Sequence, residues 1–330
     1  MSTDSADRSS TLHSARVSAA YPQLRDGVAI SPGDFHTRRW TELPELGTPA
    51  MLRLIHRIAI TVGRKAARVL LYPVTLYFVL TAARARRASY DYFQRLRGSS
   101  AHWRDVFCHF YCFAATILDR VYLLRGEFRQ FTVSLHQKEL LHDQVQSGRG
   151  CILLGSHLGS FEVLRTLGVT RAEFPLKVLM DVTHNQNITR FLDALNPQIA
   201  NTVIVPDRPD TLIKVKESLD AGFLIGTLGD RPTSDGKITH CHFLGAPAIF
   251  PGGPVLLAAM MHCPIILFFG LYRGGNRYEL YFEKLGEEVV LSRERRAEDI
   301  QYWTQRYVDR LEHYTRIAPD NWFNFYPFWD

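Results

Sequence analysis

The sequence has few cysteines and lacks the C-x-x-C pair that is common in metal and redox sites. Its five cysteines form no C-x-x-C pair, and their number is odd. Most lie among apolar residues, as buried free thiols do. His240 and His242 flank Cys241, but on a strand they would share one face, and no second ligand cluster has matching spacing. We expect a reducing compartment, no structural disulfide, no metal ion and no cofactor.

Long apolar segments are also scarce. No apolar h-region of a secretory signal occurs near the start, and residues 1–35, rich in Ser, Ala and Asp, are expected to form a disordered arm. The most apolar segment, Val69–Ala83, is shorter than the about 20 residues that span a bilayer. Pro73 lies inside it and would kink a helix there.

Acidic residues are nearly absent between Met51 and Arg104, where Asp91 is the only one. Basic residues recur there and flank the apolar segment rather than lining a polar face, and the whole chain carries a net charge of +6. We therefore expect residues 36–99 to be a helical membrane-associating segment, with no nucleic-acid partner. A buried helical cap on a soluble domain and a merely solvated basic face remain as alternatives.

Residues 100–330 show the alternation of an α/β domain. Ser100–Gly126 and Ser134–Gln146 are expected to be helices, and after Arg149 short apolar strands alternate with helices. This pattern predicts a layered α/β fold with a mixed or parallel sheet flanked by helices. The expected strands are Cys151–Gly155, Leu176–Val182, Thr202–Val205, Phe223–Leu228, Ile238–Phe243, Pro264–Leu271 and Tyr278–Phe282. The expected helices are Ser160–Leu167, Asn187–Leu195, Asp210–Ala221, Gly253–His262 and Ala297–Ile317.

The chain ends in an unusually aromatic tail, residues 321–329, which reads Asn-Trp-Phe-Asn-Phe-Tyr-Pro-Phe-Trp. Such a tail is not expected to float free in water. Either it packs onto the domain, or it helps to hold the domain at a membrane interface.

The residues that carry chemistry follow the first of these strands. His157 comes where Cys151–Gly155 ends, and Glu162 falls in the first turn of the next helix, where the helix dipole favours an ionised carboxylate. We expect Glu162 to fix the tautomer of His157, so that His157 takes a proton from a hydroxyl or amine. Gly159 would allow close approach of substrate, and the amides of Gly159 and Ser160 would support an oxyanion.

Two more candidates end another strand, because Asp230 and Arg231 follow Phe223–Leu228. They are expected to face the same cleft, where Arg231 would bind a phosphate or support the oxyanion. A structural ion pair between strand and loop explains them equally well. Further on, the Gly- and Pro-rich segment Phe243–Pro254 either lines an acyl tunnel or simply turns the chain.

Several blocks in a fixed order carry a family resemblance. Cys151–Glu162 resembles the H-x4-D/E block of the lysophospholipid acyltransferase superfamily. Ile117–Arg120, Gly229–Arg231 and Phe243–Pro254 are similar to further blocks of that family. The branch most similar is that of the bacterial late acyltransferases of lipid A biosynthesis and related predicted acyltransferases, some of which share the aromatic tail. Ser156 departs from the Asn that usually precedes the histidine in the lipid A enzymes.

The resemblance implies transfer of a fatty acyl group from a thioester, on acyl carrier protein or coenzyme A, to a hydroxyl or amine of a membrane lipid. His157 would be the general base and Glu162 its partner, without an acyl-enzyme or a metal. It also implies an enzyme at the inner membrane, with the catalytic domain on the cytoplasmic side. Two rivals are weighed against it: a non-catalytic lipid-binding protein on the same fold, and a serine hydrolase. The hydrolase would need the motif G-x-S-x-G. In Gly155–Gly159 the middle position of that motif is His157, and the serine, Ser156, lies one position too early.

Overall fold

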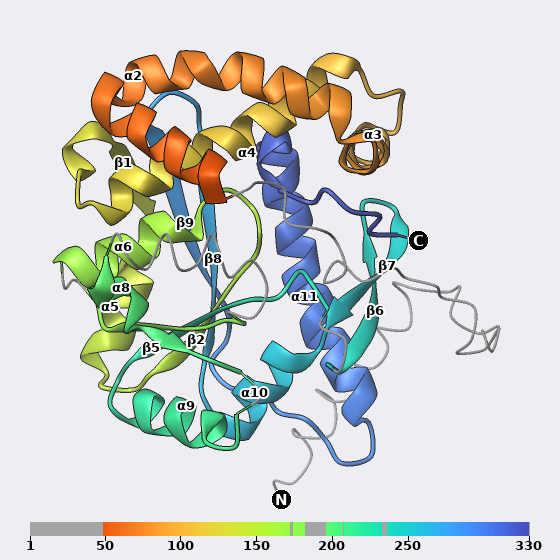
Figure 1. Ribbon diagram of the computed structural model, residues 1–330. Coiled ribbons are helices and arrows are strands. Elements are labelled where there is room, and N and C mark those ends of the chain that lie inside the picture. The colour runs from red at the N-terminus through yellow and green to blue at the C-terminus, as the bar shows by residue number, and fades with distance from the viewer. Residues whose placement is uncertain (1–48, 172–173, 182–195, 207, 233–235, 330) are drawn as a thin grey trace, which may run out of the picture. The chain divides into compact units, whose positions relative to one another are not determined.

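The computed structural model describes residues 49–171, 174–181, 196–206, 208–232 and 236–329. The chain divides into two units, and only the second, Arg39–Trp329, contains described residues. A seven-stranded sheet in the order β1-β9-β8-β2-β5-β3-β4 crosses this unit (Figure 1). The expected disordered arm, residues 1–35, lies outside the described residues.

Five neighbouring strands of the sheet run in the same direction. They are β8 (Ile265–Tyr272), β2 (Cys151–Gly155), β5 (Leu224–Leu228), β3 (Leu176–Leu179) and β4 (Val203–Ile204). At the other edge β9 (Arg277–Gly286) is antiparallel to β8, and β1 (Thr132–His136) is parallel to β9. The central strands β2 and β8 are buried along their whole length, which explains their continuous apolar sequences.

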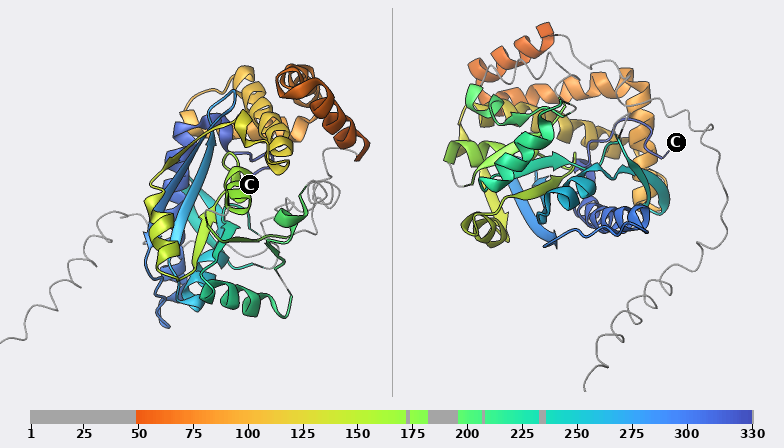
Figure 2. Two further views of the ribbon diagram at one scale, coloured as in Figure 1. Left: turned by 90° about the vertical axis from the view of Figure 1, so that its left-hand side faces the viewer. Right: turned by 90° about the horizontal axis from the view of Figure 1, so that it is seen from below.

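Helices cover both faces of the sheet, and alternate residues of β2 point to opposite sides. Cys151 and Leu153 pack with α4 (Trp103–Leu124), α5 (Glu139–Gln146) and α6 (Phe161–Arg171). Ile152 and Leu154 pack with α9 (Thr211–Asp220), α10 (Gly253–Met261) and α11 (Arg296–Ile317). The α/β architecture with a mostly parallel sheet between two helical layers agrees with the expected fold class (Figure 2). The remaining short helices are η2 (Phe128–Gln130), α8 (Pro197–Ala200) and η3 (Pro319–Asn321).

Two N-terminal helices belong to the same compact unit as the sheet. α2 (Pro49–Thr81) is interrupted by non-helical backbone at Gly63, and α3 (Ala83–Arg97) follows after a sharp turn. Arg64 on α2 pairs with the buried carboxylate of Asp119 on α4 through two hydrogen bonds of 2.8 and 2.9 Å. Arg68 and the hydroxyl of Tyr278 also bond to Asp119. The basic residues of this face of α2 therefore anchor the helix to the domain instead of reaching toward lipid headgroups.

The expected helix Ser134–Gln146 was wrong in its first part. Val133 and Leu135 alternate with exposed residues, and Thr132–His136 forms the edge strand β1 beside β9. Only Glu139–Gln146 is helical. A strand is favoured here because β9 offers unpaired backbone groups to the segment, a partner that cannot be read from local periodicity.

Phe243–Pro254, expected either to line an acyl tunnel or to turn the chain, does turn the chain, and it does so largely as regular structure. Ala246–Pro251 forms β7, which pairs antiparallel with β6 (Ile238–Phe243), and α10 begins at Gly253. The two strands join at Leu244 and Gly245, which both have positive φ, as tight hairpin turns require. On β6, His240 and His242 are exposed and Cys241 is buried, in agreement with the expected alternation.

The other expected strands and helices agree with the structure to within a few residues, apart from Asn187–Leu195, which lies outside the described part of the chain. The aromatic tail packs onto the domain, the first of the two alternatives. Trp322, Phe323, Tyr326 and Phe328 are all buried. The tail is therefore part of the folded domain rather than a free appendage.

Candidate active site

The site lies where two neighbouring parallel strands end at the same edge of the sheet (Figure 1). Gly155 at the end of β2 pairs in register with Leu228 at the end of β5. His157 and Asp230 each follow their strand by two residues. The carboxyl ends of parallel strands are where open α/β sheets bind their ligands, and here they bring His157 and Asp230 together.

Asp230 is the carboxylate that orients His157. The ring Nδ1 of His157 lies 2.8 Å from Asp230 Oδ1, and the backbone N–H of His157 donates to Oδ2 at 2.9 Å. The indole Nε1–H of Trp322 donates to the same Oδ2 at 3.0 Å. Because Oδ2 already accepts from two donors, Oδ1 is left to accept the Nδ1 proton. This arrangement leaves Nε2 of His157 with a free lone pair, as a general base requires.

The electrostatics of the pair favour a neutral histidine next to an ionised carboxylate. Burial lowers the pKa of His157 below its usual value of 6.5, and the positive charge of Arg231 lowers it further, against the opposing effect of Asp230. Burial alone would raise the pKa of Asp230, but His157 and Arg231 outweigh it and hold that pKa below its usual range. The His157 side chain keeps 31% of its exposure while that of Asp230 keeps 1%. The His157 side chain is therefore partly exposed, and its carboxylate partner is enclosed.

Arg231 lies beside the pair and is held by the C-terminal tail. Its Nη2 donates to the carbonyl of Phe323 at 2.8 Å, and its guanidinium stands over the ring of Tyr326. Its influence on both His157 and Asp230 shows that its charge acts within the site. Asp230 thus contacts His157 directly and Arg231 acts on both through its charge, so the second strand end lies beside the first.

Glu162 was expected to orient His157, and this pairing was wrong. Its carboxylate pairs with Arg120 at 2.8 Å and lies 3.6 Å from Arg165. Leu158 bridges to Trp322 and Gly159 to Gly270, and Glu162 forms its ion pairs with Arg120 and Arg165 rather than with His157. Instead the first turn of α6 directs Glu162 toward α4. Glu162 ties α6 to α4, and Asp119, next to Arg120, ties α4 to α2.

The amides of Gly159 and Ser160 are not available to an oxyanion. Gly159 N–H donates to the carbonyl of Asn321, and Ser160 N–H donates to the carbonyl of Gly270, each at 2.8 Å. Gly159 has φ of 70°, and a Cβ there would lie 1.8 Å from the Gly270 oxygen. The glycine is thus required by the chain's own backbone on β8 rather than by an approaching substrate. This corrects the expectation for both residues.

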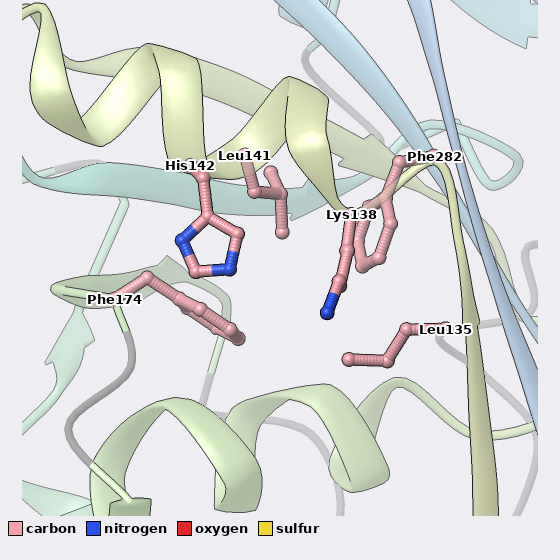
Figure 3. Close-up of a pocket in the computed structure, with 6 residues that line it drawn as sticks. All are labelled: Leu135, Lys138, Leu141, His142, Phe174 and Phe282. Atoms are coloured by element: carbon pink, nitrogen blue, oxygen red, sulfur yellow. The ribbon is translucent and has the colours of Figure 1, made fainter.

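A small pocket elsewhere in the structure is lined by residues of β1, α5 and β9 together with Phe174 (Figure 3). Lys138 and His142 point into it among apolar side chains. None of the residues expected in the site line it. In the ranges that the structure describes, no three His, Cys, Asp or Glu side chains gather where they could hold a metal ion.

His157 and Asp230 were both expected in the site from the sequence, but Glu162 was expected as the partner and Trp322 was not among the expected residues. The matching position of His157 and Asp230, two residues past their strands, was a usable signal for the pair. It becomes decisive only once β2 and β5 are known to be neighbours. No local pattern marks Trp322, because 92 residues separate it from Asp230. No protein-family model matches this chain, and no curated protein matches it either.

Proposed function

We propose that this protein transfers an acyl group from a thioester to a hydroxyl or amine of a membrane lipid. The observation that carries the proposal is the His157–Asp230 pair, with a neutral, partly exposed imidazole next to a buried carboxylate. Such a pair accepts one proton from a nucleophile, and a thioester already supplies the activated carbonyl that the nucleophile attacks. No residue of the chain needs to become acylated.

The proposed reaction needs no reactant or protein group beyond the acceptor, the thioester and these side chains. Nε2 of His157 takes the proton of the acceptor hydroxyl or amine while that oxygen or nitrogen bonds to the thioester carbonyl carbon. The tetrahedral intermediate then collapses, the carbon–sulfur bond breaks, and the imidazolium returns the proton to the departing thiolate. Asp230 stabilises the imidazolium between these events, as the orienting carboxylate of a catalytic triad does. Arg231 is the charged group best placed to stabilise the oxyanion.

The family resemblance supports the same chemistry. The residues resembling the H-x4-D/E block include His157, and the Gly229–Arg231 block contributes the carboxylate that contacts it. In this chain the orienting role falls to Asp230 of the second block, and Glu162 of the first block serves the packing of α4 against α6. The lipid A late acyltransferases and their relatives are therefore the proposed kin, with acyl carrier protein or coenzyme A as the proposed donor.

The pH dependence of acyl transfer tests the role of His157. Only the neutral imidazole accepts a proton, and the pKa of His157 lies below 6.5. The rate is therefore expected to stay flat from neutral pH down to about pH 6.5 and to fall as the pH drops through the lowered pKa. The measurement is the transfer of a labelled acyl chain from its thioester to lipid in vesicles, followed by extraction and chromatography.

Two results would contradict the proposal in different ways. A rate that rises toward acidic pH would exclude a neutral His157 as the base. Release of labelled free fatty acid, equally fast without a lipid acceptor, would indicate the rival hydrolase. Ser156 and Ser160, the serines nearest His157 in the sequence, are both buried, and nothing in their surroundings favours a nucleophilic serine.

A membrane acceptor is supported by an apolar outer face on α2. Val69, Leu76 and Leu80 recur at helical spacing and keep 65%, 48% and 66% of their exposure, whereas Leu71 and Thr75 on the opposite side are buried. The helix thus turns its polar contacts inward, through Arg64, and its apolar residues outward. Soluble domains rarely expose a contiguous apolar face of this kind, and it is typical of membrane or partner surfaces.

The helices next to α2 also expose apolar side chains. Tyr72 on α2 contacts Tyr111 on α4, with ring centroids 4.7 Å apart, and both α2 and α4 leave large apolar side chains exposed. α3 turns away at 94° and begins with the exposed Arg84 and Arg87, next to the end of the apolar face. Apolar residues beside cations fit an anionic lipid surface. We propose the cytoplasmic leaflet of the inner membrane as that surface.

The lengths and burial of the helices favour a protein that binds to the membrane surface over one that spans the bilayer. In the described ranges one helix, α4, is long and apolar enough to cross a bilayer, but 56% of its most apolar window is buried inside the fold. The segments Ile60–Thr81 and Ala83–Arg97 qualify only if they are counted together despite their 94° bend. We therefore propose that the outer face of α2 lies along the membrane surface.

Serine substitutions on the outer face test the membrane proposal. The triple variant Val69→Ser, Leu76→Ser, Leu80→Ser is expected to lower the affinity for anionic vesicles by about 100-fold, if each side chain contributes about 1 kcal/mol, part of its full burial energy. Co-sedimentation with vesicles measures this. The control is Leu212→Ser with Ile213→Ser, two exposed apolar residues on α9, which should bind as the unsubstituted protein does. Equal binding by both variants would contradict the assignment of α2.

A further inference from the structure

The C-terminal tail forms a short antiparallel pairing with the residues that carry His157. The N–H of Phe323 donates to the carbonyl of His157 at 2.9 Å, and the N–H of Gly159 donates to the carbonyl of Asn321 at 2.8 Å. Trp322 lies opposite Leu158 between these two bonds. The backbone from the carbonyl of His157 to Gly159 is therefore set by the tail, while the N–H of His157 is held by Asp230.

The side chain of Trp322 completes the arrangement from within the core. Its indole is 1% exposed, and its Nε1–H donates to Asp230 Oδ2. The indole ring packs against Tyr92, Phe243 and Phe328, with centroids 5.3, 5.0 and 4.9 Å away. A ring held on several sides offers its N–H in one direction only. The carboxylate of Asp230 is thereby kept in the rotamer that turns Oδ1 toward His157.

The tail is itself fixed at three further points. Asn321 Oδ1 accepts the N–H of Tyr272 at the end of β8 at 2.6 Å, and the carbonyl of Phe323 accepts Arg231. The carbonyl of Trp322 accepts Nε2–H of the buried His109 at 2.8 Å, while Nδ1 of His109 bonds Ser89 on α3. Burial lowers the pKa of His109 to about 4, so the ring is neutral at physiological pH. These bonds hold the tail to β8, to α4 and to the residue after Asp230.

We infer that Trp322 is a positioning residue for the proposed acyl transfer, acting through Asp230 on the tautomer and direction of His157. The inference rests on the proposed function, since it concerns the same base. Trp322 touches no reacting atom in this scheme. Its contribution is to saturate Oδ2, so that the Nδ1 proton has a single acceptor and Nε2 remains the basic atom. Trp322 then positions the base, whereas the end of the tail, including Trp329, packs against the core.

The test compares two tryptophans of the same tail. Trp322→Phe keeps a large ring but removes the N–H that Asp230 accepts. Hydrogen bonds to charged groups contribute enough that kcat should fall roughly 10- to 100-fold, with little change in KM. The matched control is Trp329→Phe, which removes an N–H that donates to the backbone carbonyl of Phe243 at 3.2 Å. This control should keep the kcat of the unsubstituted protein. Thermal unfolding of both variants reports any loss of packing separately.

A double-mutant cycle decides whether Trp322 acts through Asp230. In an Asp230→Ala background, measured in single turnovers, Trp322→Phe should bring no further loss of rate. The inference is overturned if Trp322→Phe lowers the rate by the same factor in both backgrounds, or if Trp329→Phe lowers kcat as much. Should His157→Ala leave transfer intact, the proposed function itself fails. If His157→Ala abolishes transfer while Trp322→Phe behaves like Trp329→Phe, only the inference about the tail fails.

Discussion

Replacing His157 by alanine is expected to lower the rate of acyl transfer by about 10²- to 10⁴-fold, the usual contribution of a positioned general base. The substitution removes the imidazole that we propose takes the acceptor proton, and it leaves Asp230 without its partner at Oδ1. Donor binding should change much less, because the imidazole is not required to hold the acyl chain. Labelled acyl transfer to vesicle lipid, with purified protein at neutral pH, gives the rate.

The matched control is His240→Ala on the exposed face of β6. It removes a histidine of the same kind from a surface strand and should leave the rate unchanged. If His157→Ala transfers acyl groups as fast as His240→Ala does, His157 is not the base. The rival reading of a non-catalytic lipid-binding protein would then gain support, provided that both variants still bind vesicles.

Asparagine at position 230 is expected to be nearly as damaging as the loss of His157. The oxygen at the Oδ2 position must accept from two N–H groups, those of His157 and Trp322. The amide NH2 would therefore take the Oδ1 position and donate to Nδ1, which moves the imidazole proton to Nε2. The wrong tautomer cannot act as base, and losses of about 10⁴-fold are known for this kind of change. The fold should be retained, because the amide fits the same space.

The comparison with Glu162→Gln separates the two candidate partners of His157. Glu162 is buried and pairs with Arg120 and Arg165, and removing one partner of a buried ion pair typically costs about 3 kcal/mol or more of stability. We therefore expect a lower unfolding midpoint for Glu162→Gln but a rate per folded molecule close to that of the unsubstituted protein. Thermal unfolding gives the loss of stability, and kcat measured well below the unfolding midpoint gives the rate per folded molecule. A large loss of kcat in well-folded Glu162→Gln would restore Glu162 to the catalytic pair.

The position of the base was readable from the sequence because it depends on local features. An apolar strand, a turn containing His157, and a helix that follows are all encoded within residues 151–171. The apolar outer face of α2 is local in the same sense, since spacing along one helix decides which side chains share a face. The layered α/β fold followed from the alternation of such segments, without knowledge of how the strands are ordered.

The partner of the base was decided by tertiary structure alone. Asp230 is 73 residues away from His157 and reaches it only because β5 lies next to β2 in the sheet. A glutamate five positions from the histidine looked like the nearer partner, but in the folded structure it pairs with Arg120 on α4 instead. Strand order depends on the packing of the whole domain, so it cannot be inferred from the spacing of two residues in the sequence.

The aromatic tail shows most clearly which features the sequence predicts and which only the tertiary structure decides. Its composition already indicated that it would not stay in water, and of the two expected alternatives the structure shows packing onto the domain. Which groups it touches depended on where the end of α11 delivers the chain relative to β2, β5 and β8. The sequence by itself thus determined most of the helices and strands and the position of a histidine at a strand end. Only the folded structure decided which carboxylate and which indole N–H complete the site, because those contacts join segments that are neighbours in space alone.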